Sequence, residues 1–153
     1  MMKQLLKCAA LSLSMAVATA FAQGGQTATA VLSLDGTWSL ALDPANVGRE
    51  QKWFEKAQVE GAKPAQVPWI IQEAFPECHG VVWYAREFDA PLNPHPGGRC
   101  LLRFWQVDYL ADVWVNGKNV GGHEGGETPF VLDVTDAVKP GGKNRLTVRV
   151  LNP

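Results

Sequence analysis

Long apolar segments are missing from this chain of 153 residues. The apolar run at 8–17 is too short to cross a bilayer, and no other segment approaches the roughly 20 continuous apolar residues that a membrane-spanning helix needs. Clusters of one charge are missing as well, because 14 Lys and Arg nearly balance 15 Asp and Glu. Nucleic-acid phosphates require a basic patch, so we expect neither a membrane nor a nucleic acid as a partner.

Nucleophilic serine and phosphate-binding glycine motifs are missing too. Beyond residue 22 the serines are Ser33 and Ser39, and neither lies in the G-x-S-x-G turn that exposes a serine nucleophile. The glycines at 121–126 precede a strand-like segment instead of a helix, so they offer no helix N-terminus to a phosphate. These absences argue against esterase activity and nucleotide binding.

Histidine is scarce, with His79, His95 and His123 as its 3 occurrences, and their spacing differs from that of zinc ligands. Cys78 and His79 are neighbours in sequence and cannot easily share one tetrahedral site with Cys100. No calcium ligand set can be read from the loops. We therefore assign no metal site and no cofactor, with zinc as a remote alternative.

The N-terminal segment resembles a secretory signal peptide. A short basic start, a mostly apolar run and the A-x-A-like sequence Ala20-Phe21-Ala22 follow one another. We therefore predict a signal peptide over 1–22, cleaved near Ala22, and a linker over 23–30. The mature chain would be exported, either secreted or periplasmic.

Cys78 and Cys100 are the cysteines that remain after this cleavage. In an oxidising compartment a disulfide between them would persist. The sequence does not report the distance between their Cα atoms, which decides whether a bond can form. A possible disulfide and a pair of free thiols therefore both stay open.

Helical periodicity is nearly absent from the mature chain. Short runs rich in Val, Leu, Trp and Phe recur between Gly, Pro and Asp, which is the pattern of an antiparallel β-sandwich. Leu146, Val148 and Val150 alternate with polar residues, as in a half-buried strand. The interval 45–79 is predicted to be irregular. Strands are predicted over 36–42, 82–89, 99–107, 111–116, 119–122, 129–134 and 145–151.

Two local sequences predict turns. Asn116-Gly117 supplies the positive φ angles of a type I′ turn, which predicts a β-hairpin. Asp136 follows polar residues that can cap backbone N–H groups, which predicts a single helical turn over 136–139.

A series of short motifs runs through the mature chain between residues 31 and 151. The motifs are Leu34-Asp35-Gly36-Thr37-Trp38, Val67-Pro68-Trp69, Trp83-Tyr84-Ala85-Arg86-Glu87-Phe88, Val113-Trp114-Val115-Asn116-Gly117-Lys118, Gly122-His123-Glu124-Gly125-Gly126-Glu127-Thr128-Pro129-Phe130, Asp133-Val134-Thr135 and Asn144-Arg145-Leu146-Thr147-Val148-Arg149-Val150. Each is weakly specific alone. In this order and spacing they resemble the N-terminal domain of family 2 glycoside hydrolases, the group of β-galactosidases, β-glucuronidases and β-mannosidases.

The resemblance implies an all-β fold over 31–153, a jelly-roll β-sandwich of the galactose-binding-domain type. In full-length members an immunoglobulin-like sandwich and a TIM barrel follow, and the barrel performs the hydrolysis. The sequence ends at Pro153, before the segment that usually completes the jelly roll in relatives. We therefore expect a truncated domain without its last strand, whose partners would be the missing sandwich and barrel.

Hydrolysis with retention needs two carboxyl groups about 5–5.5 Å apart. In this family both are barrel glutamates, so the resemblance implies no catalytic residue in this chain and no activity of the chain alone. Its expected role is to support the active site of an exported glycosidase that binds a β-glycoside. The alternatives are a free-standing carbohydrate-binding module and a purely structural sandwich.

Five side chains are candidates for contact with the sugar. His123, Glu124 and Glu127 lie in a segment that, by resemblance, reaches over the barrel mouth in some members. Glu77 and His79 lie in the loop before the next strand, near the active-site side in relatives. Loops bring side chains together on a ligand. Solvated loop charge is the competing interpretation.

Aromatic side chains are better explained by packing than by sugar stacking. Those inside predicted strands are expected to pack, namely Trp38, Trp83, Trp105 and Trp114. Trp53 and Trp69 lie in the irregular interval and are the better candidates for exposure, although packing is favoured for them as well.

Overall fold

The computed structural model of the protein describes residues 28–153. The signal peptide predicted over 1–22 and most of the predicted linker lie outside these residues. The described chain forms strands and short 3-10 helices, which confirms the all-β class. The elements are β1 (Gly36–Leu42), η1 (Trp53–Glu55), β2 (Lys63–Val67), η2 (Ile71–Glu73), β3 (Gly80–Asp89), β4 (Leu101–Phe104), β5 (Leu110–Val115), β6 (Lys118–Glu124), β7 (Phe130–Asp133) and β8 (Lys143–Asn152). None of the helices in this range is long and apolar enough to span a membrane.

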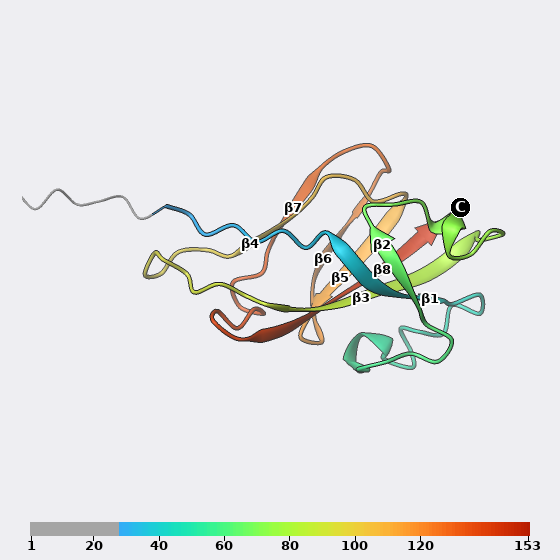
Figure 1. The fold of residues 1–153 in the computed structure, drawn as a ribbon, viewed down its shortest axis with the longest axis horizontal. Helices are drawn as coiled ribbons and strands as arrows, with labels where there is room; N and C mark the ends of the chain where they lie inside the picture. Colours follow the sequence, from blue (N-terminus) through green and yellow to red (C-terminus); the bar gives the residue numbers. More distant parts are fainter. Residues whose placement is uncertain (1–27) are drawn as a thin grey trace, which may run out of the picture.

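Two sheets make up the fold (Figure 1). The large sheet has six strands in the order β2-β1-β3-β8-β5-β6, and the small sheet pairs β4 with β7. All pairings are antiparallel, and β3 and β8 pair along their whole length. Phe104 and Phe130 of the small sheet stack on each other and pack into the core formed with the large sheet. This arrangement is the jelly-roll type of β-sandwich that the motif series implies.

Alternation along β8 places Leu146, Val148 and Val150 in the core between the sheets, where they are almost fully buried. The sequence predicts a half-buried strand, and here the prediction is wrong. Thr147 and Arg149, on the opposite face of the strand, are also buried. Another part of the chain must therefore cover that face.

The outer face of the large sheet, which points away from β4 and β7, is covered in part by the segment 43–56. Trp53 and Phe54 of this segment pack on Trp83 and Trp114, with ring centroids 6.0 Å apart for Trp53 and Trp83 and 5.1 Å apart for Phe54 and Trp114. In Figure 1 the segment lies at the lower right, away from β7 at the top. This second apolar cluster explains why β8 is buried on both faces.

The interval predicted to be irregular, 45–79, contains one strand, β2, at the edge of the large sheet. Ala65 and Val67 face the core and alternate with the exposed Pro64 and Gln66, but two apolar residues in a segment with a proline are too weak a strand signal. Proline is tolerated because an edge strand has one side without ladder hydrogen bonds. The pairing of β2 with β1 is therefore set by the tertiary structure.

Other local predictions are confirmed with shifted boundaries. Asn116 and Gly117 have φ values of 53° and 82°, as the type I′ hairpin between β5 and β6 requires. The single turn predicted over 136–139 begins one or two residues earlier, because the N–H groups of Ala137 and Val138 both donate to the Val134 carbonyl.

Candidate functional site

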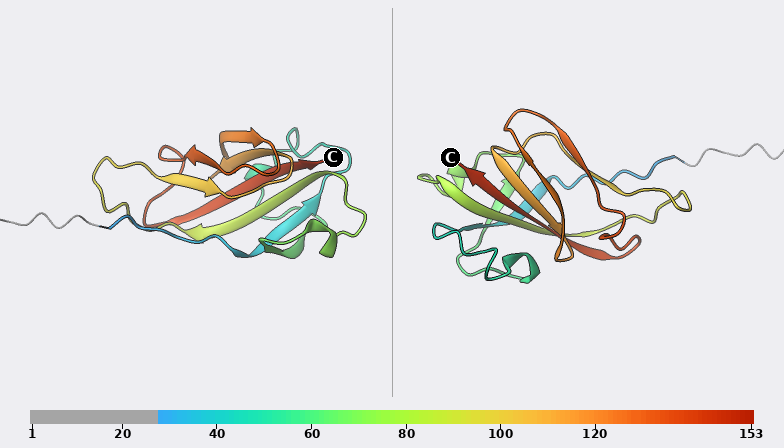
Figure 2. Two further views of the ribbon diagram at one scale, coloured as in Figure 1. Left: turned by 90° about the horizontal axis from the view of Figure 1, so that it is seen from above. Right: turned by 180° about the vertical axis from the view of Figure 1, so that it is seen from behind.

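Four strands of the large sheet meet at the end where β8 finishes, which we call the site end. The strand register puts Gly80 opposite Asn152, and Leu110 opposite both Leu151 and Glu124. The site end therefore combines the starts of β3 and β5 with the ends of β6 and β8. Both views in Figure 2 show the C-terminus beside the start of β3. The five predicted sugar-contact residues lie at or next to this end.

His123 lies on β6 and is held on two sides. Its imidazole stacks on the Phe130 ring with centroids 4.5 Å apart, and its Nε2 lies 2.8 Å from the Thr128 hydroxyl oxygen. Phe130 is itself buried in the core. The imidazole is therefore anchored by the core and positioned by the loop that follows β6.

Glu124, the last residue of β6, accepts a hydrogen bond of 3.1 Å from the Tyr109 hydroxyl. Both side chains are exposed. The hydrogen bond to Glu124, and then its negative charge, raise the pKa of Tyr109. A carboxylate has acceptor sites beyond the one that Tyr109 occupies, so Glu124 can also accept from the hydroxyls of a ligand.

The segments 105–109 and 124–129 lie side by side and form what we call the loop pair. The Gly125 N–H donates to the Tyr109 carbonyl at 3.0 Å. A Cβ atom on Gly126 would lie 2.5 Å from a carboxylate oxygen of the exposed Asp108, so a larger residue there would displace that side chain. The backbone hydrogen bond from Gly125 therefore holds the two loops side by side. Glu127, in the second loop, is exposed.

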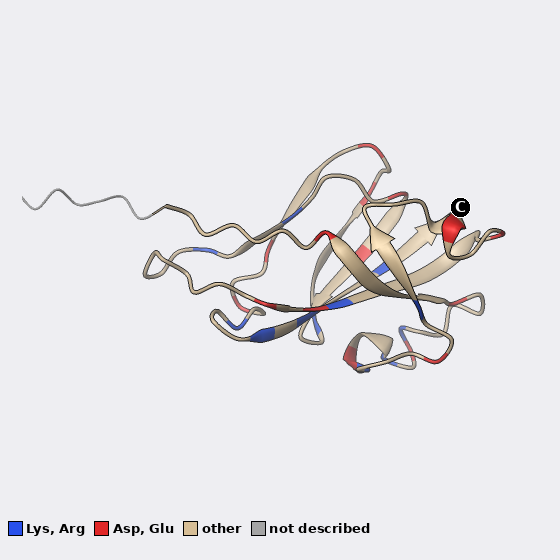
Figure 3. Ribbon diagram, viewed as in Figure 1, with Lys and Arg blue, Asp and Glu red and all other residues tan. Residues whose placement is uncertain are grey.

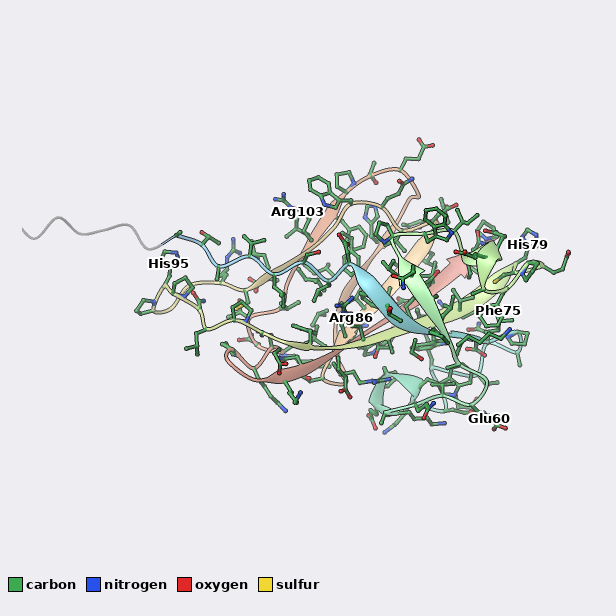
Figure 4. All side chains as sticks on the ribbon, viewed as in Figure 1. Glu60, Phe75, His79, Arg86, His95 and Arg103 are labelled. Carbon is green, nitrogen blue, oxygen red and sulfur yellow. The ribbon has the colours of Figure 1, made fainter. Side chains whose placement is uncertain are left out.

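Glu77 and His79 lie on the other side of the site end, before β3, and both are exposed. His79 Nδ1 is 3.3 Å from the Pro153 carbonyl oxygen, and Figure 4 labels the imidazole at this edge of the molecule. Because β8 and β5 lie between β3 and β6, the first residues of β3 are about 14 Å from Glu124 at ordinary strand spacing. The structure thus separates the five candidates into two groups.

Trp105 is predicted to pack inside a strand over 99–107, and this prediction is wrong. β4 ends at Phe104 instead of continuing to 107, so Trp105 begins the loop and is 74% exposed. The Arg103 guanidinium lies 5.4 Å from its ring centroid. Trp53 packs on the outer face, as favoured, whereas Trp69 is exposed, so the packing favoured for Trp69 is wrong. Trp38, Trp83 and Trp114 are buried, as predicted.

Cys78 and Cys100 are free thiols, so of the two alternatives the structure has the unpaired one. Cys78 is buried just before the start of β3, and its carbonyl accepts from Asn152. Cys100 lies beside Asn93, past the far end of β3. A strand of this length separates the two residues by more than the roughly 7 Å across which Cα atoms can be bridged.

The loop pair suits a hydroxylated ligand. It offers the carboxylates of Glu124 and Glu127, the Tyr109 hydroxyl and the exposed indole of Trp105, which can lie flat on an apolar sugar face. Acidic and basic residues are interspersed along the ribbon (Figure 3). Within residues 28–153 no group of three or more His, Cys, Asp or Glu could hold a metal ion.

Comparison with known proteins identifies the family of the domain. Residues 63–153 match the family model described as "Glycosyl hydrolases family 2, sugar binding domain". A β-glucuronidase of Paenibacillus borealis is 38% identical over 127 residues, which are 80% of this chain and 21% of that protein. A β-glucuronidase of Canis lupus familiaris is 33% identical over 135 residues, covering 78% of this chain and 20% of that protein.

The crystal structure of a β-glucuronidase from Ruminococcus gnavus has the same fold, with a TM-score of 0.72 and 28% identity over 79% of this chain and 21% of that one. The chain thus spans about a fifth of the length of these relatives. Since the family match covers more than half of the sequence, the chain belongs to the sugar-binding domain of family 2 glycosyl hydrolases.

Proposed function

We propose that the chain is the N-terminal domain of an exported β-glucuronidase of this family. The domain would support the barrel active site, and the catalytic glutamate pair would lie in a part of the enzyme outside these residues. Two findings support the proposal: the relatives described above are β-glucuronidases, and the match covers about a fifth of each. The basic and apolar start of the sequence supports export.

The observation that carries the proposed sugar contact is the hydrogen bond between Tyr109 and Glu124 within the loop pair. Tyr109 orients the carboxylate, and the backbone bond from Gly125 to the Tyr109 carbonyl fixes the two loops relative to each other. A carboxylate held in one place loses little entropy when it accepts from a sugar hydroxyl. The domain would therefore contribute binding and positioning of the β-glucuronide, without a chemical step of its own.

The first test assays the chain alone with 4-nitrophenyl β-D-glucuronide. We expect no turnover, because a retaining reaction needs a pair of carboxyl groups about 5–5.5 Å apart. Turnover by the purified chain would contradict the proposal. Sequencing the coding DNA beyond codon 153 should reveal a frame that continues into a second sandwich and a barrel, and mass spectrometry of the exported product should find Gln23 at its start.

The second test uses the enzyme encoded by that longer frame. Glu124→Gln should raise KM for the glucuronide about threefold to tenfold while kcat changes less, because a charged hydrogen bond to the substrate is weakened. Glu60→Gln is the matched control, since Glu60 is an exposed carboxylate in the loop before β2. Equal effects of the two substitutions would show that the loop pair does not contact the sugar.

One observation favours the free-standing carbohydrate-binding module, and it is the exposed indole of Trp105. A module would bind a glycan without any further domain, and Trp105→Ala would abolish that binding. A stop codon after residue 153 together with such binding would replace the enzyme-domain proposal.

A further inference from the structure

A pocket of about 510 Å³ lies on the outer face of the large sheet, beside the part that segment 43–56 covers. Three neighbouring strands form its floor, with Ser39 on β1, Glu87 on β3 and Arg145 on β8. They share this face because Ser39 pairs with Ala85, and Glu87, two residues further along β3, pairs with Arg145. The pocket is therefore built on the most regular part of the sheet.

Arg145 is poorly satisfied. Its side chain is 18% exposed, its nearest ionic partner is Glu87 at 4.0 Å, and its Nε is buried without a hydrogen-bond partner. Arg149, four residues further along the same face of β8, also has a buried Nε without a partner, but its other N–H groups donate to Asp112 at 3.1 Å and to Asn46 at 2.8 Å. Burial lowers the pKa of Arg145, as expected for a cation with little compensation. A guanidinium in this setting favours an anion that can accept its remaining N–H groups.

The rest of the lining supplies small and polar groups together with two further cations, Lys63 and Arg86. Hydroxyl and amide side chains come from Thr37, Ser39 and Gln58, and Ala57 and Ala62 leave room beside them. Side chains of this kind exchange hydrogen bonds with ligand hydroxyls. The volume lies within the range of small-molecule sites, which is about 300–1,000 Å³, and the pocket is wide open to solvent, so a bound ligand would stay partly exposed.

We propose that this pocket is a second ligand site of the domain and that it binds a sugar acid, with Arg145 holding the carboxylate and Ser39 and Gln58 contacting the hydroxyls. Carboxylate geometry matches the planar guanidinium better than a point charge would, which makes arginine the suitable cation. Glu87 competes with the ligand for Arg145, so it limits the affinity. The site is independent of the loop pair and of the proposed glucuronidase function.

The test titrates the full chain with D-galacturonate and follows backbone amide signals by nuclear magnetic resonance. The signals of Ser39, Ala85 and Arg145 should shift, and neutral D-galactose and acetate should each bind at least about tenfold more weakly. Arg145→Gln should weaken galacturonate binding at least about tenfold, since hydrogen bonds to a charged group are lost. Glu87→Gln should tighten it about threefold, because the competing carboxylate is removed.

Arg99→Gln is the matched control, because Arg99 is exposed and pairs with Asp133 on the other sheet, so its loss should leave galacturonate binding unchanged. Circular dichroism checks that each variant is folded. The proposal is overturned if D-galactose shifts the same signals equally, if shifts occur only at His123 and Glu124, or if Arg99→Gln weakens binding as much as Arg145→Gln. If Arg145→Gln does not fold, the test depends on Glu87→Gln. An unchanged affinity of Glu87→Gln for D-galacturonate then overturns the proposal.

Discussion

The two halves of the outer face of the large sheet each contain an arginine of β8, and they differ in the acceptors that surround it. In the covered half, Arg149 is 5% exposed and bonded to Asp112 and Asn46 beneath the segment 43–56. In the open half, Arg145 faces a pocket and has Glu87 as a distant partner. Two arginines on one strand thus show that burial of a charge follows the availability of acceptors, and not its position in the strand.

The covered half is held by Asp43. This carboxylate is 1% exposed and accepts hydrogen bonds from the N–H groups of Val47 and Gly48 at 2.8 Å and from the Trp83 indole at 2.9 Å. Gly48 packs so closely on Trp83 that a Cβ atom would lie 2.5 Å from the indole nitrogen. Asp43 therefore joins the covering segment to the sheet, and no equivalent residue joins the chain to the sheet near Arg145 among the contacts described.

The largest expected effect comes from breaking that attachment. Asp43→Ala leaves the Trp83 indole and two backbone N–H groups without their acceptor, so the free energy of unfolding should fall by about 3–4 kcal/mol. Urea denaturation followed by tryptophan fluorescence measures it. Asp89→Ala is the control, because Asp89 is exposed in a 3.7 Å pair with Lys143 and should cost less than about 1 kcal/mol. Equal losses in the two variants would contradict the role assigned to Asp43.

A direct comparison of the two arginines should give the next largest effect. Arg149→Met leaves Asp112 in a half-buried position with only Arg49 as an ionic partner, so the free energy of unfolding should fall by about 2 kcal/mol. Arg145→Met should change it by less than about 0.5 kcal/mol, because no hydrogen bond is lost. Urea denaturation of both variants measures the difference, and a larger loss for Arg145→Met would reverse the comparison.

The sequence predicts this sheet well where the signal is local. The strand β8 is predicted by the alternation of Leu146, Val148 and Val150, and the hairpin is predicted by Asn116-Gly117. The burial of Arg149 could not be predicted, because Asn46 lies 103 residues away and reaches it only after segment 43–56 folds over the sheet. The same holds for β2, because its alternation of Ala65 and Val67 is too short to predict the pairing with β1.

The candidate site shows the same limit. Glu124 and His123 could be named from the motif, but the partner of Glu124 is set by the register of β5 and β6, which brings Tyr109 to it across 15 residues. The exposure of Trp105 depends on where β4 stops pairing with β7, at Phe104 opposite Phe130. A residue pattern does not report such an end point, so the most exposed aromatic of the loop pair was expected inside a strand.

Two tyrosines differ in burial in a similar way, because Tyr84 packs against the core and Tyr109 is exposed. The half-buried Tyr84 gives rise to a pH dependence of stability. Burial, and then the nearby Cys78, raise the pKa of Tyr84 to about 12. In the unfolded chain it ionises near pH 10, so its stabilising contribution is complete below pH 10 and is lost as the pH rises towards 12. Between pH 10 and pH 12 the free energy of unfolding of Tyr84→Phe should therefore fall by about 1–2 kcal/mol less than that of the wild type. Urea denaturation at several alkaline pH values checks this, and identical slopes would contradict it.

The smallest effect concerns Tyr109, whose pKa is raised by its hydrogen bond to Glu124 and by the charge of that carboxylate. Glu124→Gln removes the charge and weakens the acceptor, so the titration of Tyr109 should move to lower pH, measured on the ring carbon signals of ¹³C-labelled tyrosine. Glu127→Gln, at an exposed residue of the neighbouring loop, should leave the titration unchanged. A Tyr109 titration that is the same in the wild type and Glu124→Gln would mean that the hydrogen bond does not persist in solution. The loop pair would then have no fixed carboxylate to offer a sugar, and the contrast between a preorganised site end and an unsatisfied Arg145 would disappear.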